Sequence, residues 1–263
     1  MRRKVRIAIG LPWYKGPDDT TFMPILGLQH YFGRIEVQSR LSPEEGRHVS
    51  TGEDGAADLH HLDETLQEQV ELDFCICVAS NISLPGMARE IVVEQAINAG
   101  ADVLFSFDYD MIVTPAAFMR LLLDVLDPTL DVRVVAALAF TGRLPLAPVI
   151  YEVKTAKDGR PHFDPKHDYV RNALQKVGAF GTGTFMANME VFKAVPKPWF
   201  NVAGGMGEDL FFTGVRCFDH GVPVYVDTRA KVLHKPTVPV EFHGEEMYLR
   251  QQALMVKGDG NEA

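Results

Sequence analysis

A largely apolar run, Val103–Phe107, ends abruptly in two carboxylates, Asp108 and Asp110, which are separated by Tyr109. Strands of a parallel sheet are buried on both faces and therefore apolar throughout, so the run predicts such a strand. Ligand sites in open α/β sheets lie just beyond the carboxyl ends of strands. Two carboxylates at such an end can bind one divalent cation, whose charge offsets their repulsion. The alternative is a polar turn that caps the next helix, because Asp-x-Asp is a common sequence.

The first 140 residues alternate between strand-like and helix-like patterns. Short apolar or alternating runs predict strands at residues 4–10, 35–38, 74–79 and 132–140. Helical periodicity and turn residues predict helices at residues 20–33, 57–70, 87–99 and 115–126. Such βαβ units predict an α/β fold whose central sheet is wound largely in parallel.

The pattern changes after residue 141, where proline and glycine become frequent. Strands are predicted at residues 149–153, 178–187 and 222–226, with a hairpin turn at Asp158-Gly159. Helices are predicted at residues 189–194, 207–218 and 245–254. No internal repeat or linker divides the chain, so its 263 residues are expected to form a single domain.

The net charge of −9 comes from one segment of the chain. Residues 43–73 contain ten acidic residues and one arginine, Arg47, which leaves 25 acidic and 25 basic residues elsewhere. We therefore interpret residues 41–73 as an acidic insertion in an otherwise neutral protein. The rest of the chain has no strong basic patch that would favour nucleic acid, and no general excess of charge that would repel it.

Three cysteines, Cys75, Cys77 and Cys217, are an odd number, and the first two lie in an apolar strand pattern. Buried thiols are the favoured interpretation, with a metal site or a disulfide as the alternative. No run of 18 apolar residues is present, and Met1-Arg2-Arg3-Lys4 leads directly into a strand. These features predict a soluble, cytoplasmic protein without a transmembrane segment.

Further polar and glycine-rich motifs follow Asp108-Tyr109-Asp110 in a fixed order, and with them the chain resembles the nucleotide-sugar glycosyltransferases of the GT-A fold. The likeness is nearest to the small family-2-like enzymes of bacteria and phages. The matching segments are Leu11-Pro12, Ala88-Arg89, residues 105–111, Thr141-Gly142-Arg143 with Pro145 and Pro148, the glycine-rich strand, Pro198-Trp199-Phe200, Gly207-Glu208-Asp209-Leu210 and His234. Two features depart from the pattern: Tyr109 stands where a small residue is usual, and the acidic insertion has no counterpart.

The resemblance implies a GT-A-like, Rossmann-like fold with a mostly parallel central sheet flanked by helices and a smaller mixed region on the acceptor side. Residues 1–140 would form the nucleotide-binding half and residues 141–240 the acceptor-side half. Residues 241–263 would form a C-terminal helix and tail.

The same resemblance implies a donor site that contains Mn²⁺ or Mg²⁺. Asp110 would bind the metal, Asp108 would assist it or contact the ribose, and His234 would be the third protein ligand. Carboxylates with one imidazole suit these ions better than a structural zinc site. The remaining donor contacts would come from Arg89, Tyr109 and Pro12. A solvated or structural histidine is the alternative for His234.

On the acceptor side, the resemblance makes Asp209 the general base that deprotonates the acceptor hydroxyl, with Glu208 supporting it. A base opposite the leaving group gives inversion by direct displacement. The alternative is that the two acids only stabilise the start of a helix. Trp199, Gly181 and Gly183 would contact the acceptor. Core packing explains the tryptophan equally well, and the alternatives for the glycines are an approach of the backbone to the donor or only a strand bulge.

The function implied is transfer of a sugar from a nucleoside-diphosphate sugar, with a UDP-sugar favoured, to an acceptor hydroxyl. The acceptor expected by default is a saccharide or glycan. A hydroxymethylated base of phage DNA is the second possibility, for an enzyme encoded by a phage and acting in the host cytoplasm. A sugar nucleotidyltransferase would need a glycine-rich loop bearing Arg or Lys after the first strand, which residues 10–16 do not supply. A non-catalytic sugar-nucleotide-binding module is the last alternative.

Overall fold

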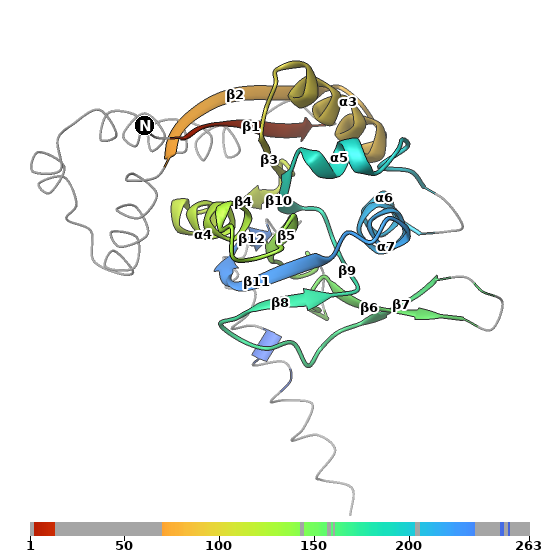
Figure 1. The fold of residues 1–263 in the computed structure, drawn as a ribbon. Coiled ribbons are helices and arrows are strands. Elements are labelled where there is room, and N and C mark those ends of the chain that lie inside the picture. The colour runs from red at the N-terminus through yellow and green to blue at the C-terminus, as the bar shows by residue number, and fades with distance from the viewer. Residues whose placement is uncertain are drawn as a thin grey trace, which may run out of the picture.

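The computed structural model describes residues 3–13, 70–142, 145–156, 159, 161–202, 206–234, 248–249 and 252. Its main sheet has seven strands: β1 (Arg3–Trp13), β2 (Val70–Ser80), β3 (Val103–Phe107), β5 (Val134–Leu138), β8 (Leu174–Val177), β10 (Thr184–Asn188) and β11 (Val224–Lys231). They lie in the order β2-β1-β3-β10-β5-β11-β8 (Figure 1). The protein therefore has an α/β fold around a large sheet.

The sheet is mixed, so the prediction of a largely parallel sheet is confirmed only in part. The pairs β1–β2, β1–β3 and β5–β11 are parallel, whereas β10 runs antiparallel to both β3 and β5, and β8 runs antiparallel to β11. The single strand predicted at residues 178–187 is in fact two strands: residues 179–180 belong to a smaller sheet, and β10 enters the main sheet between β3 and β5. A short buried strand is apolar in either direction, so the pattern of its residues does not reveal its orientation.

Helices cover both faces of the sheet (Figure 1). The helix α4 (Pro115–Leu126) packs on one face, in a core with Phe105 and Val135. The helices α3 (Pro85–Asn98) and α5 (Glu190–Ala194) pack on the opposite face, in a core with Leu104. Because neighbouring residues of a strand point to opposite faces, Leu104 and Phe105 belong to different cores.

Local signals place both long helices. The Thr114 hydroxyl caps α4 by accepting a hydrogen bond from the Ala117 backbone N–H at 3.2 Å, and Pro115 occupies the first turn. The helix α3 begins at Pro85, two residues earlier than predicted, and ends before Gly100, whose φ is +66°. No described helix is long and apolar enough to cross a membrane.

A second sheet of three strands lies beside the first, in the order β7-β6-β9: β6 (Ile150–Thr155), β7 (Pro161–Pro165) and β9 (Ala179–Phe180). The hairpin predicted near Asp158-Gly159 joins β6 to β7, with Gly159 at a φ of +81°. A two-strand ladder pairs β4 (Met111–Ile112) with β12 (Leu233–His234). The predicted helix at residues 207–218 forms as three consecutive pieces: α6 (Glu208–Leu210), a π-helical turn η2 (Phe211–Arg216) and α7 (Cys217–Asp219).

The other predicted ends of strands and helices agree with the structure to different degrees. The predictions for β3 and α4 are confirmed at both ends, whereas β1 extends to Trp13 and therefore includes Pro12. Residues 70–73 belong to β2. The helix predicted at residues 57–70 and the acidic insertion interpreted as residues 41–73 therefore both extend too far toward the C-terminus. The strand β8 was not predicted. The predictions for residues 14–69 lie outside the described residues. Near the C-terminus, residues 248–249 and 252 are helical as predicted.

A buried acid pair joins α4 to β11, away from Asp108 and Asp110. Asp124 and Asp227 are 5% and 0% exposed, and Arg229 bonds to both, with Nη2 at 2.6 Å from Asp227 Oδ2 and 3.4 Å from Asp124 Oδ1. Burial raises the pKa of Asp124 to about 8, and the hydrogen bond and charge of Asp227 contribute in the same direction. The pKa of Asp227 is lowered, so the environment favours an uncharged Asp124 beside an ionised Asp227.

This pair predicts that stability falls as pH rises from about 5 to 8. The unfolded Asp124 has a pKa of about 3.9, so in this window the folded state binds one more proton, and the free energy of unfolding falls by up to about 1.4 kcal/mol per pH unit. Asp124→Asn removes this dependence. Urea denaturation between pH 5 and pH 8 measures it, with Asp131→Asn at an exposed aspartate as the control. Equal pH slopes in wild type and Asp124→Asn would contradict the assignment.

Candidate functional site

A buried guanidinium joins the end of β3 to the start of α6. Arg89 lies in the second turn of α3, and its side chain is 6% exposed. Its Nη2 donates to both carboxylate oxygens of Asp108 at 2.7 Å, and its Nη1 donates to Glu208 Oε1 at 2.5 Å. A Cβ on Gly86 would lie 3.2 Å from the Glu208 Cβ, so the glycine lets α6 approach α3 closely. Arg89 thus fixes two of the predicted site carboxylates relative to each other.

The environment of Asp108 disfavours its charged form. Burial raises the pKa of Asp108 to about 6; Arg89 opposes this shift, and the charges of Asp110 and Glu208 add to it. Four carboxylates are close enough to influence one another here, because Glu208 in turn raises the pKa of Asp209. This concentration of negative charge favours a bound cation.

The ladder between β4 and β12 brings His234 to Asp110. His234 pairs with Met111 in the register, and its Nε2 lies 3.2 Å from Asp110 Oδ2. Its Nδ1 lies 3.0 Å from the carbonyl oxygen of Phe140, which can only accept, so Nδ1 carries a proton, and a hydrogen bond to Asp110 requires a second proton on Nε2. The pKa of His234 is raised first by the hydrogen bond to Asp110, against the effect of burial. The structure therefore brings together two residues that the resemblance assigns to the metal.

The donor set around Asp110 fits an ion that takes only part of its coordination from the protein. A backbone carbonyl that holds Nδ1–H leaves Nε2 directed at Asp110, which is the usual arrangement behind a metal-binding histidine. Within the described ranges, no three metal-ligating side chains converge, and both oxygens of Asp108 face Arg89. Mg²⁺ is commonly held by one or two carboxylates, with phosphate oxygens and water completing the shell.

Gly142 explains part of the Thr141-Gly142-Arg143 motif. A Cβ at this position would lie 3.3 Å from two atoms of the His234 ring, so the glycine makes room for the imidazole. This motif was part of the resemblance, but no role was assigned to it. No spacing rule relates Gly142 to a histidine 92 positions later in the sequence. Arg143 lies outside the described residues.

Asp209 is held at the start of α6 next to the glycine-rich loop. Its Oδ1 accepts from the Leu210 backbone N–H at 2.7 Å, and its Oδ2 would lie 3.4 Å from a Cβ on Gly181. A Cβ on Gly207 would come within 2.6 Å of Oδ1, so the residue before Glu208 has to be small. Burial raises the pKa of Asp209, against the bond from Leu210. A carboxylate with a raised pKa is a stronger proton acceptor.

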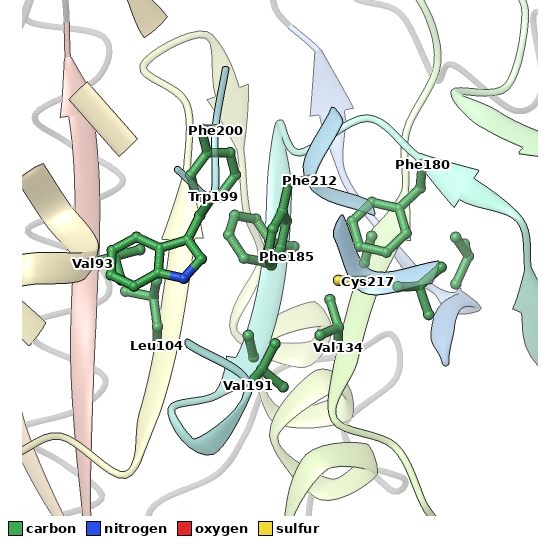
Figure 2. Packing of buried hydrophobic residues seen from close by; sticks show 14 of the residues in the cluster. Val93, Leu104, Val134, Phe180, Phe185, Val191, Trp199, Phe200, Phe212 and Cys217 are labelled. Atoms are coloured by element: carbon green, nitrogen blue, oxygen red, sulfur yellow. The ribbon is translucent and has the colours of Figure 1, made fainter. Parts of the chain in front are cut away.

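The predicted acceptor residues occupy three different environments. Gly183 accepts a hydrogen bond from the Asp108 N–H through its carbonyl oxygen at 2.8 Å, which places the loop beside the carboxylates. Gly181 packs against Val149, where a Cβ would come within 2.4 Å of Cγ1. Trp199 is 3% exposed and donates through Nε1 to the Val195 carbonyl at 2.6 Å, so its contacts are those of a core residue (Figure 2).

The remaining donor-side residues lie near the end of the sheet. Pro12 is buried in β1 opposite Ala79 of β2. Tyr109 is partly exposed and packs against the core on the α4 face. Glu90, which was not predicted, accepts from the Phe200 N–H at 2.5 Å and thereby ties the segment before α6 to α3.

Comparisons with known proteins find similarity only among solved structures. No family model and no curated protein matches the chain. The crystal structure of A197 from STIV is 13% identical over 92% of this chain and 99% of that chain, with a TM-score of 0.46. A CMP:2-keto-3-deoxy-manno-octonic acid synthetase complexed with CTP is 12% identical over 97% of this chain and 99% of that chain, with a TM-score of 0.38. With both TM-scores below 0.5, neither match identifies a function for this chain.

Proposed function

We propose that the protein is a metal-dependent glycosyltransferase that moves a sugar from a nucleoside-diphosphate sugar to an acceptor hydroxyl with inversion. The observation that carries the proposal is the pairing of Asp110 with His234 beside the Asp108–Arg89–Glu208 network. This pairing would give one edge of the site two ligands for a divalent cation. The network also leads directly to Asp209, a carboxylate with a raised pKa.

At the donor end, Asp110 and His234 would hold Mn²⁺ or Mg²⁺. The ion would supply the positive charge that neutralises the departing diphosphate. Asp108, held through both oxygens by Arg89, would contact the ribose or the hydrated ion. Pro12 and Tyr109 would line the nucleotide side, where β1 and β3 end.

At the acceptor end, Asp209 would accept the proton of the attacking hydroxyl. The acceptor oxygen forms a bond to the anomeric carbon as the bond from that carbon to the diphosphate oxygen breaks. The nucleoside diphosphate leaves with the bonding electrons, and the proton remains on Asp209. Glu208 is held by Arg89 and would support this geometry without taking the proton, since its Oε1 is already an acceptor from Nη1.

A saccharide or glycan hydroxyl is the acceptor we propose, with a hydroxymethylated DNA base as the alternative. Binding of a DNA acceptor would weaken steeply as salt rises, because bound cations are released from the phosphates. Binding of an uncharged saccharide would change little over the same range. A salt titration of acceptor binding therefore distinguishes them.

The donor end predicts a thermal stabilisation that needs both metal and nucleotide. Among UDP-, GDP-, CDP- and TDP-sugars, we expect a UDP-sugar with Mn²⁺ to raise the melting temperature most, since a ligand at 100 times its Kd adds about 2.7 kcal/mol. Asp110→Ala should lose the Mn²⁺-dependent part of this shift. Differential scanning fluorimetry measures both effects.

The matched control for this experiment is Asp164→Ala on β7. Asp164 also pairs with a histidine, with His162 Nε2 at 2.9 Å from its Oδ1, but on an exposed hairpin. This variant should keep the full shift. If Asp110→Ala keeps an Mn²⁺-dependent shift of wild-type size, Asp110 does not bind the metal.

A further inference from the structure

A π-helical turn begins at Phe211, two residues after Asp209. The residues of η2 make wider, i→i+5 turns, which are rare and often mark functional sites. The turn packs tightly against the smaller sheet at Gly214. A Cβ on this glycine would come within 2.2 Å of the Phe163 ring on β7 and 2.9 Å of the Ala179 Cβ on β9. The helical segment that carries Asp209 is therefore fitted closely onto β9.

Thr213 makes the polar connection in the same turn. The residue is 1% exposed, and its Oγ1 lies 2.8 Å from the Asp209 carbonyl oxygen and 3.0 Å from the Phe180 carbonyl oxygen. The Phe180 N–H donates to the same oxygen at 3.2 Å. One hydroxyl proton is thus shared between two carbonyls, while the oxygen accepts from one N–H. This hydroxyl bonds three backbone groups, the buried N–H and carbonyl of Phe180 and the partly buried carbonyl of Asp209.

The connection continues to the donor end of the site. Phe180 immediately precedes the Gly181-Thr182-Gly183 loop, and Gly183 accepts the hydrogen bond from the Asp108 N–H at 2.8 Å. Residues 180–183 therefore join the turn of Asp209 at one end to the end of β3 at the other. A displacement of the Thr213 contact would change the position of Asp209 relative to Asp108.

We propose that Thr213 is a positioning residue that sets the place of Asp209 relative to the donor end, through hydrogen bonds to Asp209 and Phe180. The inference rests on the proposed function, in which Asp209 is the general base. Misplacing a reacting group by about 1 Å can cost about 10²-fold in rate. Thr213 therefore acts on the rate of the chemical step without contacting substrate.

Thr213→Val tests the inference, because a methyl group of similar size replaces the hydroxyl. We expect kcat for transfer from the stabilising UDP-sugar with Mn²⁺ to fall about 10- to 100-fold, with an unchanged donor KM. Thr213→Ser keeps the hydroxyl and should retain kcat within about threefold of wild type. Thr213→Ala, which removes the hydroxyl without a new methyl contact, gives the same test if the valine variant does not fold.

Thr228 on β11 offers a closely matched control. It is 0% exposed, and its Oγ1 bonds to the carbonyl oxygens of Val170 and Ala173 at 2.9 and 3.0 Å and accepts from the Ala173 N–H at 2.9 Å. Thr228→Val should lower the melting temperature about as much as Thr213→Val, because it loses the same set of bonds. Its kcat should stay at the wild-type value.

The outcomes separate this inference from the proposed function. Wild-type kcat in Thr213→Val, or an equal loss of kcat in Thr228→Val, would overturn the positioning role. Asp209→Asn is measured alongside them. If Asp209→Asn is inactive while Thr213→Val is fully active, only the positioning inference fails. If Asp209→Asn transfers sugar at the wild-type rate, the proposed base is wrong and the inference fails with it.

Discussion

Asp209→Asn is expected to lower the rate of sugar transfer about 10²- to 10⁴-fold while donor binding stays intact. The amide has the size of the carboxylate, and its oxygen can still accept from the Leu210 N–H, so the start of α6 is preserved. It cannot accept the proton of the acceptor hydroxyl. Single-turnover kinetics gives the transfer rate, and isothermal titration with UDP-sugar and Mn²⁺ gives the donor Kd.

The control for this variant is Asp219→Asn, which changes an exposed aspartate at the other end of the same helical segment. Its transfer rate should match that of wild type. If Asp209 only stabilised the helix start, its replacement would cost about 0.3–1 kcal/mol of stability and leave transfer unchanged. That result would refute the assignment of the base.

Arg89→Met is expected to destabilise the protein by about 3–5 kcal/mol, because it leaves Asp108 and Glu208 without their buried counter-ion. The methionine fills much of the space of the arginine, so the loss comes mainly from the unpaired charges. Urea denaturation at neutral pH measures the change in the free energy of unfolding. Arg133→Met, at an exposed arginine paired with Asp131, should cost less than about 1 kcal/mol.

Neutralising the partners should compensate for the loss of Arg89. Combining Arg89→Met with Asp108→Asn and Glu208→Gln removes the uncompensated charges, and replacing both sides of a buried ion pair is often neutral. We therefore expect the triple variant to recover most of the stability lost in the single variant. If the triple variant is less stable than Arg89→Met, Arg89 does not stabilise the protein through its ion pairs.

The parts of the fold that could be predicted are those with local signals at both ends. The strand β3 is an apolar run between Asp102 and Asp108, and α4 begins at a threonine cap followed by Pro115. The direction of β10 could not be predicted, because it depends on which neighbours the strand meets. The π-helical turn η2 could not be predicted either, because its residues continue an ordinary apolar helical pattern.

The candidate site depends even more on contacts between residues that are far apart in the sequence. Asp110 and His234 are 124 residues apart, and only the pairing of β4 with β12 brings them together. Arg89 was predicted to contact the donor, but the structure pairs it with two carboxylates that its sequence position does not reveal. Thr213 has no sequence signal, because a threonine in an apolar helix is unremarkable until its hydroxyl is seen to bond β9.

In the proposed reaction, the bond broken lies between the sugar and the diphosphate. The most direct measurement is ³¹P NMR of the products formed from a UDP-sugar, Mn²⁺ and a saccharide acceptor, with and without pyrophosphate. We expect UDP to be released whether or not pyrophosphate is present. Formation of UTP and a sugar 1-phosphate only when pyrophosphate is present would contradict it, because those are the products of a sugar nucleotidyltransferase.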